Sequence, residues 1–473
     1  MTLKLRKKKL HIKIGFSLLI SLFSSAVQAQ ITVNLPAANI ISRTEYLSSI
    51  TLGEFNSAIT LLPNIGIRSV NTTFNNIVGG VGPAPLGIAN FKISSIAGIS
   101  VLGTSTERSL STSSQSLFAA VASLVSGTVL SNLRLTTSSF TWVAGTYSTD
   151  IALTAPGLLG GNAMSPPTQS FSIVVPAFIT AQNTAGTTSI LVNNLSFYRS
   201  PTGISGNKVI TLAHTVPYIP SLQTGNSNFS FSTNLTYNNL PVTPVSTVNT
   251  TLTAVGNATP INLSSTAQTL TNTSGIVVPT SNSGALTHAF SITGAQLKAR
   301  FVQAGTYSVP LTYIWNKLSS AYPTGGLQSQ SVGTLEVVVS ELSELIANQQ
   351  TVSLSFTSAN HYKNGMNQDM PAHLKLSKTT PYNLYVRATS ATFASGVNSI
   401  PLNVMRIGPM PGETGMQTVT LSSTAQQLIN AADPTIDRSL SIRYTIPASE
   451  TSKLLNKPAG TYSTNIIFSL VAP

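Results

Sequence analysis

The sequence predicts an all-β protein built from tandem β-sandwich domains, and three observations carry that prediction. The string AGTYS occurs three times at nearly equal spacing, and apolar and polar residues alternate after each copy. Short segments of this kind, bounded by Gly, Pro and Asn, are typical of β-sandwiches. Charged residues make up 8% of the chain, against a usual level of roughly 25%. Coiled coils and charged helical bundles are thereby excluded, because their exposed faces need Glu, Lys and Arg.

The repeat is the strongest pattern in the chain. Copies of AGTYS begin at Ala144, Ala304 and Ala459, so the spacings are 160 and 155 residues. Two further motifs keep the same order: LSTSSQSL, LSSTAQTL and LSSTAQQL begin at Leu110, Leu263 and Leu421, and ITVNLP, FSIVVP and LEVVVS begin at Ile31, Phe171 and Leu335. Solenoid units span only roughly 20–50 residues. These repeats are therefore domains, which we predict at residues 30–165, 166–330 and 331–473.

Each AGTYS motif predicts a turn followed by a strand with one buried face. Tyr147, Tyr307 and Tyr462 begin the apolar parity of these strands, and we expect their hydroxyls to bond to backbone, as in the tyrosine corner of immunoglobulin folds. Gly145, Gly305 and Gly460 precede them and are expected to serve the turn. Short helices are expected around residues 115–122 and 341–348.

The N-terminus predicts a secretory signal peptide. A block of basic residues ends at Lys13, a short apolar run covers residues 14–26, and Val27 and Ala29 are the small residues of a cleavage site. We expect cleavage after Ala29, so that residues 1–29 are removed. Six of the positive charges behind the formal net charge of +13 lie in this segment. No Lys/Arg-rich stripe remains after it, so the sequence predicts no nucleic-acid partner.

Ionisable groups are too scarce to indicate catalysis or metal binding. The chain has 12 Asp and Glu residues, and none of them lies between Ile151 and Leu335. His361, Asp369 and His373 share a polar segment, but their spacing matches no structural zinc pattern. Solvated loop residues are the favoured reading there. We predict no catalytic residue, no metal and no cofactor.

Two tryptophans are candidates for stacking on sugars. Trp315 has the buried parity of its strand, which favours the core, whereas Trp142 lies just before a turn.

The third repeat resembles a known family. It contains Pro381-Tyr382, then LSSTAQQL, then a Pro-Ala-Gly-Thr-Tyr turn ending at Tyr462 and a last alternating strand. In these features it is similar to the spore coat protein U domain, the fold of archaic chaperone–usher pilus subunits. The resemblance is weaker in the other repeats. It implies an incomplete immunoglobulin-like, pilin-like sandwich, completed by a strand from a neighbouring subunit, and it implies export, a periplasmic chaperone, an usher and a surface fibre.

Together these observations predict an exported, non-enzymatic surface protein, either a fimbrial subunit or a tip adhesin. Its expected partners are other fibre subunits or further copies of itself, head to tail, and a chaperone, an usher or a host or surface glycan. Its expected location is the cell surface or the extracellular space. One alternative is a secreted carbohydrate-binding protein with closed, independent domains, and another is a hydrolase that uses the His361–His373 segment.

The opening strands of the repeats decide how the domains connect. Each strand either completes its own domain, or it completes the domain before it. In the second arrangement, which the resemblance favours, the first strand is left over as a donor and the third repeat keeps an open edge. A mixed case, with the first repeat closed and only the third open, would suit a fibre tip. The candidate donor residues are Ile31, Val33 and Leu35, and the candidate inter-repeat residues are Phe171, Ile173, Val175, Leu335, Val337 and Val339.

Overall fold

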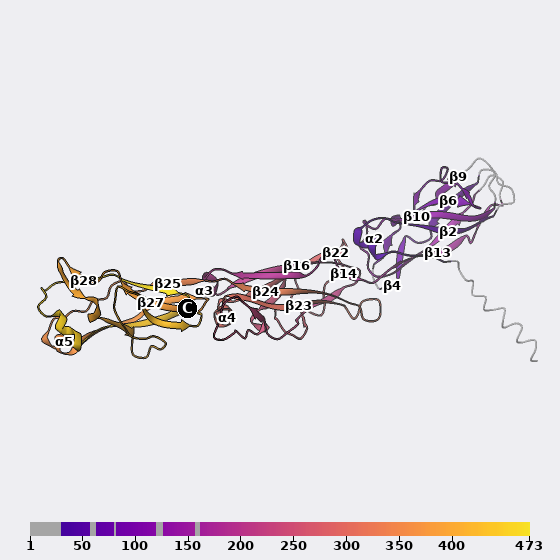
Figure 1. Ribbon diagram of the computed structural model, residues 1–473. Helices are drawn as coiled ribbons and strands as arrows, with labels where there is room; N and C mark the ends of the chain where they lie inside the picture. Colours follow the sequence, from indigo (N-terminus) through magenta and orange to yellow (C-terminus); the bar gives the residue numbers. More distant parts are fainter. Residues whose placement is uncertain (1–29, 57–62, 80–81, 120–125, 157–160) are drawn as a thin grey trace, which may run out of the picture.

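In the computed structural model the chain forms three β-sandwich bodies that lie end to end in an extended row (Figure 1). The structure describes residues 30–56, 63–79, 82–119, 126–156 and 161–473; the predicted signal peptide lies outside them. The prediction of an all-β protein is confirmed, because each body consists of packed sheets with only short helices. None of the described helices has the length and apolar character of a membrane span.

The first body contains two main sheets, ordered β1-β13-β11-β3-β9 and β12-β2-β10-β6-β7. Strands β4 and β5 extend the first sheet, and β8 pairs with β6. Its elements are β1 (Gln30–Asn34), α2 (Ala37–Ser42), β2 (Tyr46–Asn56), β3 (Asn64–Ser69), β4 (Thr73–Val78), β5 (Ala84–Pro85), η1 (Leu86–Ile88), β6 (Ala89–Ile96), β7 (Ile99–Ser100), β8 (Arg108–Ser109), β9 (Gln115–Ala119), β10 (Gly127–Leu135), β11 (Gly145–Thr154), β12 (Ala163–Ser165) and β13 (Thr168–Val175).

The second body repeats this plan with sheets β14-β16-β22-β19-β20 and β15-β24-β23-β17-β21. Strand β18 pairs with β23. Its elements are β14 (Ile179–Ala181), β15 (Gly186–Val192), α3 (Ser196–Arg199), β16 (Ile204–His214), β17 (Tyr218–Thr224), β18 (Ser230–Ser232), η2 (Val245–Thr247), β19 (Asn249–Thr253), β20 (Ile261–Asn262), β21 (Gln268–Thr269), β22 (Ser283–Ile292), α4 (Gly294–Arg300), β23 (Gly305–Lys317) and β24 (Gln328–Val339).

The third body has a complete sheet, β25-β26-β33-β30-β31, facing a much smaller one, β32-β27-β34. Strands β28 and β29 form a separate hairpin. Its elements are β25 (Ser343–Ala347), α5 (Ala359–Asn364), β26 (Gly365–Lys378), β27 (Tyr382–Ala388), β28 (Thr392–Ser395), β29 (Asn398–Pro401), η3 (Leu402–Val404), β30 (Arg406–Pro409), β31 (Val419–Thr420), β32 (Gln426–Ala432), β33 (Thr435–Pro447), η4 (Ala448–Leu454) and β34 (Ile466–Val471).

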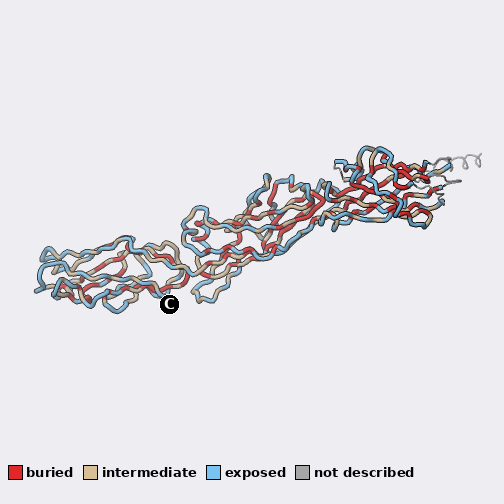
Figure 2. The backbone as a smooth tube through the Cα atoms, turned by 90° about the horizontal axis from the view of Figure 1, so that it is seen from above, coloured by how far each residue is buried: buried red, intermediate tan, exposed pale blue. Residues whose placement is uncertain are grey.

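Each body has its own apolar core, and Figure 2 shows buried segments inside all three. The leucines that bound the glutamine motif are buried in every copy, at 2% exposure or less. The backbone amides of Leu110, Leu263 and Leu421 donate to Ala89, Val248 and Met405 in the three bodies. The prediction of short helices around residues 115–122 and 341–348 is wrong. The chain forms strands β9 and β25 there, because these segments pair with β3 and β26.

Candidate functional site: a groove along the third body

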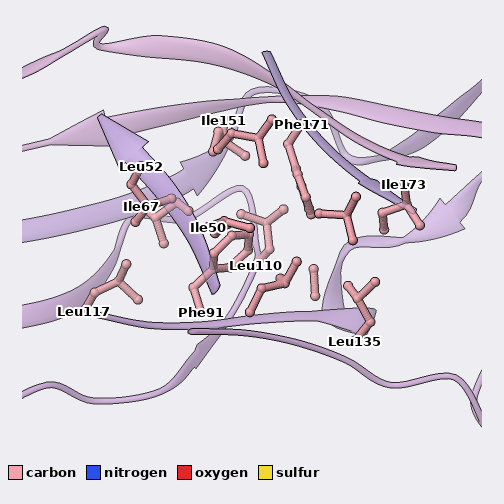
Figure 3. Packing of buried hydrophobic residues seen from close by; sticks show 14 of the residues in the cluster. Ile50, Leu52, Ile67, Phe91, Leu110, Leu117, Leu135, Ile151, Phe171 and Ile173 are labelled. Atoms are coloured by element: carbon pink, nitrogen blue, oxygen red, sulfur yellow. The ribbon is translucent and has the colours of Figure 1, made fainter. Parts of the chain in front are cut away.

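The strand β13 lies in the first body, not at the start of the second. It pairs antiparallel with β11, from Gly145 opposite Val175 to Ala152 opposite Thr168. The side chains of Phe171, Ile173 and Val175 are at most 2% exposed and belong to the core of the first body. Figure 3 shows Phe171 and Ile173 within this core. The division between the first two bodies therefore falls at about Pro176, not at residue 165 as the motif spacing suggests. Sequence proximity to the second repeat does not decide which sheet a strand joins.

Strand β1 also lies in the first body, which corrects the expectation of a spare donor strand. Residues Gln30–Asn34 run parallel to β13, with Ile31 opposite Phe171 and Val33 opposite Ile173. Ile31, Val33 and Leu35 are 8%, 4% and 1% exposed. Both the first strand and the inter-repeat strand thus complete the same sheet of the first body, where they lie side by side.

The second body is completed in the same way. Strand β24 pairs antiparallel with β23, so that Tyr307 lies opposite Val337, and it pairs parallel with β15, so that Ile190 also lies opposite Val337. The side chains of Leu335, Val337 and Val339 are at most 3% exposed in that core. This boundary too lies later than predicted, near Ser340 instead of residue 330.

The third body lacks the corresponding strand. Within the described chain, β34 pairs only with β27, whereas β11 and β23 each pair with strands on both sides. In the third body, residues 349–357 correspond to β1 and β15 of the first two bodies. Half-buried and exposed residues alternate there as along a strand, but no strand is formed. Val352, Leu354 and Phe356 are half-buried, in contrast to the buried side chains of β1.

A groove of about 990 Å³ occupies the missing strand's position. Val352, Leu354 and Phe356 line it on one side, and Tyr462, Ile466 and Phe468 line it on the other. All six side chains are only half-buried and pack against the core of the third body. Residues 349–357 were not among the predicted site residues, although their period-two alternation is the pattern that indicates a strand there.

The recurrent tyrosines show the same difference between the bodies. Each hydroxyl donates to the carbonyl four residues earlier, at 3.0 Å from Tyr147 to Val143, 3.1 Å from Tyr307 to Gln303 and 2.9 Å from Tyr462 to Pro458. Tyr147 and Tyr307 are fully buried, whereas Tyr462 is half-buried beside the groove. The local hydrogen bond is therefore independent of the missing strand, but the burial of the ring depends on it.

This difference predicts unequal costs of truncation. Tyr307→Ala is expected to lower the free energy of unfolding of the second body by about 3 kcal/mol, because it empties a closed core. Tyr462→Ala is expected to cost about 1 kcal/mol in the third body, since its ring already faces the groove. Denaturant melts of the two variants measure both values. Equal losses would contradict an open third body.

The glycines of the motif also differ in their surroundings. Gly145 and Gly305 have φ of 153° and 148° and lie against the backbone of residues 78 and 232, so that an added Cβ would clash there. Around Gly460 the nearest described atom is the Ser395 hydroxyl, 3.4 Å from such a Cβ.

The expectation of solvated loop residues around the metal-site candidates is wrong, because Asp369 and His373 lie in strand β26 and His361 lies in helix α5. His373 is buried, with its two ring nitrogens 3.0 Å from Gln349 Oε1 and from the Tyr444 hydroxyl. Asp369 instead forms an ion pair with Arg443. Among the residues that the structure describes, no group of three or more His, Cys, Asp or Glu is arranged to hold a metal ion.

Both tryptophans are fully buried, so neither ring is presented to a sugar. Trp142 Nε1 donates to the carbonyl of Thr137 at 3.0 Å, and its ring packs edge-on against Phe140 and Tyr147. The carbohydrate-binding alternative therefore loses both residues that were expected to stack on a sugar.

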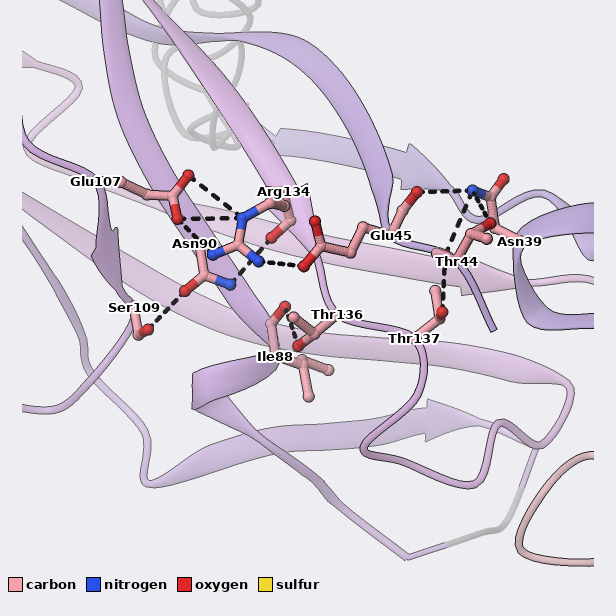
Figure 4. A network of polar contacts seen from close by, with 10 residues as sticks. All are labelled: Asn39, Thr44, Glu45, Ile88, Asn90, Glu107, Ser109, Arg134, Thr136 and Thr137. Atoms are coloured by element: carbon pink, nitrogen blue, oxygen red, sulfur yellow. Dashed lines mark hydrogen bonds and ion pairs between the residues drawn. The ribbon is translucent and has the colours of Figure 1, made fainter. Parts of the chain in front are cut away.

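The first body contains a cluster of charged residues that are paired with one another. In the first body Arg134 bonds to both Glu45 and Glu107, and Asn90 donates to the Arg134 carbonyl (Figure 4). These contacts tie β10 to β6 through Asn90, and to the residues directly before β2 and β8 through Glu45 and Glu107.

A second cluster joins the second body to the third. Asp437 accepts from Lys298 at 2.8 Å and from Arg199 at 2.9 Å, both in the second body, and from Lys375 at 3.1 Å in the third. Burial raises the pKa of Asp437, but the hydrogen bonds from these three cations outweigh burial and hold the pKa well below its usual range. The carboxylate is thus charged at neutral pH and fixes the two bodies together.

Comparison with known proteins finds similarity only among solved structures. No protein-family profile and no curated protein matches the chain. CfaE, the adhesive subunit of CFA/I fimbria of enterotoxigenic Escherichia coli, is 12% identical with a TM-score of 0.28, and the match covers 66% of this chain and 98% of CfaE.

Two further structures show similarly low values. The CsuC-CsuE chaperone–tip adhesion subunit complex from Csu pili of Acinetobacter baumannii is 12% identical with a TM-score of 0.28, covering 62% of this chain and 99% of that one. The CupB6 tip adhesin from Pseudomonas aeruginosa is 9% identical with a TM-score of 0.25, covering 63% and 91%. At these values the function has to be inferred from the groove itself.

Proposed function

We propose that this chain is an exported, non-enzymatic fibre subunit whose third body takes up a β-strand donated by another chain. One observation carries the proposal: strands β13 and β24 complete the first two bodies, and the third body has a groove where its equivalent would lie. Strand addition supplies backbone hydrogen bonds, and alternate side chains fill pockets. The half-buried apolar residues on both sides of the groove suit this kind of ligand.

The direction of the donated strand follows from the two filled bodies. β13 and β24 run antiparallel to β11 and β23 and parallel to β1 and β15. A donated strand is therefore expected to run antiparallel to β34 and parallel to residues 349–357. Its apolar side chains would contact Phe356 and Phe468 in the way that Phe171 and Val337 fill the other cores.

We infer from the position of β1 that the chain lies at one end of a fibre. Because β1 completes its own body, the described residues offer one acceptor groove and no spare strand. Such a subunit accepts a partner on one side only, and its first body remains free to make adhesive contacts. Delivery by a periplasmic chaperone and an usher belongs to the same proposal, since an exposed apolar edge is an aggregation hazard until it is covered.

A synthetic peptide with the sequence of residues 328–342 tests the proposal, because it contains β24. Added to the full chain at about 100 times its Kd, it is expected to stabilise the third body by about 2.7 kcal/mol, since it binds only the folded form. Calorimetry measures the shift, and hydrogen exchange is expected to slow in segments 350–357 and 462–470.

The matched control is the same peptide with Ser in place of Leu335, Val337 and Val339, which keeps the backbone donors but cannot fill the apolar pockets. If both peptides act alike, the groove does not recognise a strand. If neither binds, even when the strand is joined covalently to the C-terminus, the proposal is wrong.

A further inference from the structure

The two internal junctions of the chain are built from one repeated set of hydrogen bonds. Thr215 stands between β16 and β17, and its carbonyl accepts from the Ala144 amide of the preceding body at 2.8 Å. Thr379 stands between β26 and β27, and its carbonyl accepts from the Ala304 amide, also at 2.8 Å. In both cases the alanine is the first residue of an AGTYS motif. We call this arrangement the threonine junction.

The hydroxyl of each threonine ties the linker into the same junction. Thr215 Oγ1 donates to the Pro176 carbonyl at 2.7 Å and accepts from the Phe178 amide at 3.1 Å. Thr379 Oγ1 donates to the Ser340 carbonyl at 2.8 Å and accepts from the Leu342 amide at 2.7 Å.

The backbone amides of the two threonines return the bond, at 3.1 Å to Phe178 and Leu342. Each linker is therefore held at three points.

The sequence marks both junctions in the same way. Each threonine begins a Thr-x-Pro-Tyr string, TVPY at Thr215 and TTPY at Thr379. Thr215 lies 39 residues after Pro176, and Thr379 lies 39 residues after Ser340. The strand that completes one body is thus followed by a short linker and, at a constant distance, by the threonine that fixes the next body.

The end of the third body carries the AGTYS side of a third junction but has no threonine partner for it within the described chain. Ala459 begins the third AGTYS motif, and the Tyr462 hydroxyl bond is formed there as in the other copies. However, Ala459 is exposed, whereas Ala144 and Ala304 are 1% and 2% exposed. Within the described chain, no backbone carbonyl accepts from the Ala459 amide.

The sequence of the first repeat has no Thr-x-Pro-Tyr string at the corresponding position, part of which lies outside the described residues. Where the second and third bodies have Thr-x-Pro-Tyr, the first has Leu61-Leu62-Pro63-Asn64, with leucine at the threonine position. Leucine has no hydroxyl to hold a linker. The first repeat of a second copy, which is the one that would follow Ala459, therefore lacks this threonine, and Thr215 and Thr379 are already engaged in the internal junctions.

We propose that the chain that donates its strand to the third body also forms a threonine junction with Ala459. This inference rests on the proposed function and identifies the partner further. The partner is a protein other than a second copy, with an alternating apolar strand, a three-residue linker and a Thr-x-Pro-Tyr string 39 residues after the first linker residue. Its threonine carbonyl accepts from the Ala459 amide, so that the partner continues the row of bodies at a fixed angle.

A four-body chain supplies a defined partner for the test. It consists of residues 1–473 followed by a second copy of residues 319–473, because Pro473 is equivalent to Leu318 at the spacing of the AGTYS motifs. The appended part presents the β24 strand, its linker and a Thr379 junction to the original third body. Hydrogen exchange at the Ala459 amide is expected to be at least about tenfold slower than in the three-body chain.

The junction is tested by Thr379→Val in the appended copy alone, which removes the hydroxyl and keeps the size of the side chain. We expect Ala459 exchange to speed up roughly fivefold, the equivalent of one hydrogen bond. Small-angle scattering is expected to report a looser joint between the last two bodies. Thr424→Val in the same copy is the matched control, because Thr424 is exposed and its hydroxyl has no hydrogen bond within the described chain.

The outcomes separate the two proposals. If segments 350–357 and 462–470 become protected but Ala459 does not, the strand is accepted and the threonine junction is wrong. If those segments stay unprotected, strand uptake itself fails, and the junction fails with it. Head-to-tail polymers of the unmodified chain in sedimentation experiments would overturn the exclusion of a second copy as partner.

Discussion

Deletion of residues 30–36 is expected to unfold the first body and to leave the other two folded. The deletion removes β1, whose Ile31 and Val33, with the adjacent Leu35, are buried in the first core. Burial of one such side chain contributes about 1.5–3 kcal/mol, so the loss is roughly 5 kcal/mol or more. This approaches the whole stability of a domain, which is about 5–15 kcal/mol.

Calorimetry of the truncated chain measures the loss as the disappearance of one unfolding transition. Thr32→Ser is the matched control, because Thr32 faces solvent on the same strand. Uptake of the 328–342 peptide by the third body should be unaffected. A first body that kept its transition after the deletion would show that β1 is dispensable there and is available for donation.

Acidification from pH 7.5 to pH 5 is expected to destabilise the second body by about 4 kcal/mol, more than either of the other bodies. Burial lowers the pKa of His214 and that of His288 to about 4. In the unfolded chain both titrate near 6.5, so protons bind the unfolded form first as the pH falls. The stability is complete above pH 6.5 and falls between pH 6.5 and pH 4, by about 2 kcal/mol for each histidine at pH 5.

The variant His288→Leu separates the two contributions. Neither ring nitrogen of His288 has a hydrogen-bond partner in the described chain, so the substitution leaves no polar group unpaired. About half of the pH dependence should disappear, with no loss of stability at pH 7.5. Denaturant melts at several pH values measure this, and His361→Gln in the third body is the control. An unchanged slope in His288→Leu would contradict the assignment.

Much of the strand pattern could be predicted from local sequence. The alternation after each AGTYS motif gave strands β11, β23 and β34, because a strand with one buried face needs period two. The burial of Trp315 followed from the same parity. By contrast, residues 115–119 and 343–347 form strands where short helices were expected, because pairing with β3 and β26 outweighs local preference.

The open edge of the third body could be predicted from the sequence only as one of several possible strand arrangements. The apolar parity of Phe171, Ile173 and Val175 shows that one face of the strand is buried, but not in which body. Both neighbouring bodies are equally close along the chain. The choice depends on which sheet has an unpaired edge, and that edge is formed by residues more than a hundred positions apart, as for Ile31 opposite Phe171.

The sequence by itself determined that the chain is a β-rich array of three similar units with almost no ionisable chemistry, because composition, period and repeats are properties of the residues alone. Only the tertiary structure decided that Tyr147 and Tyr307 are enclosed while Tyr462, in an identical AGTYS motif, borders a groove. The physical reason is that the burial of a side chain depends on the neighbouring strand as well as on the strand that carries it. Two of the motif strands, β11 and β23, pair with a later strand of the same chain, and within the described chain β34 does not.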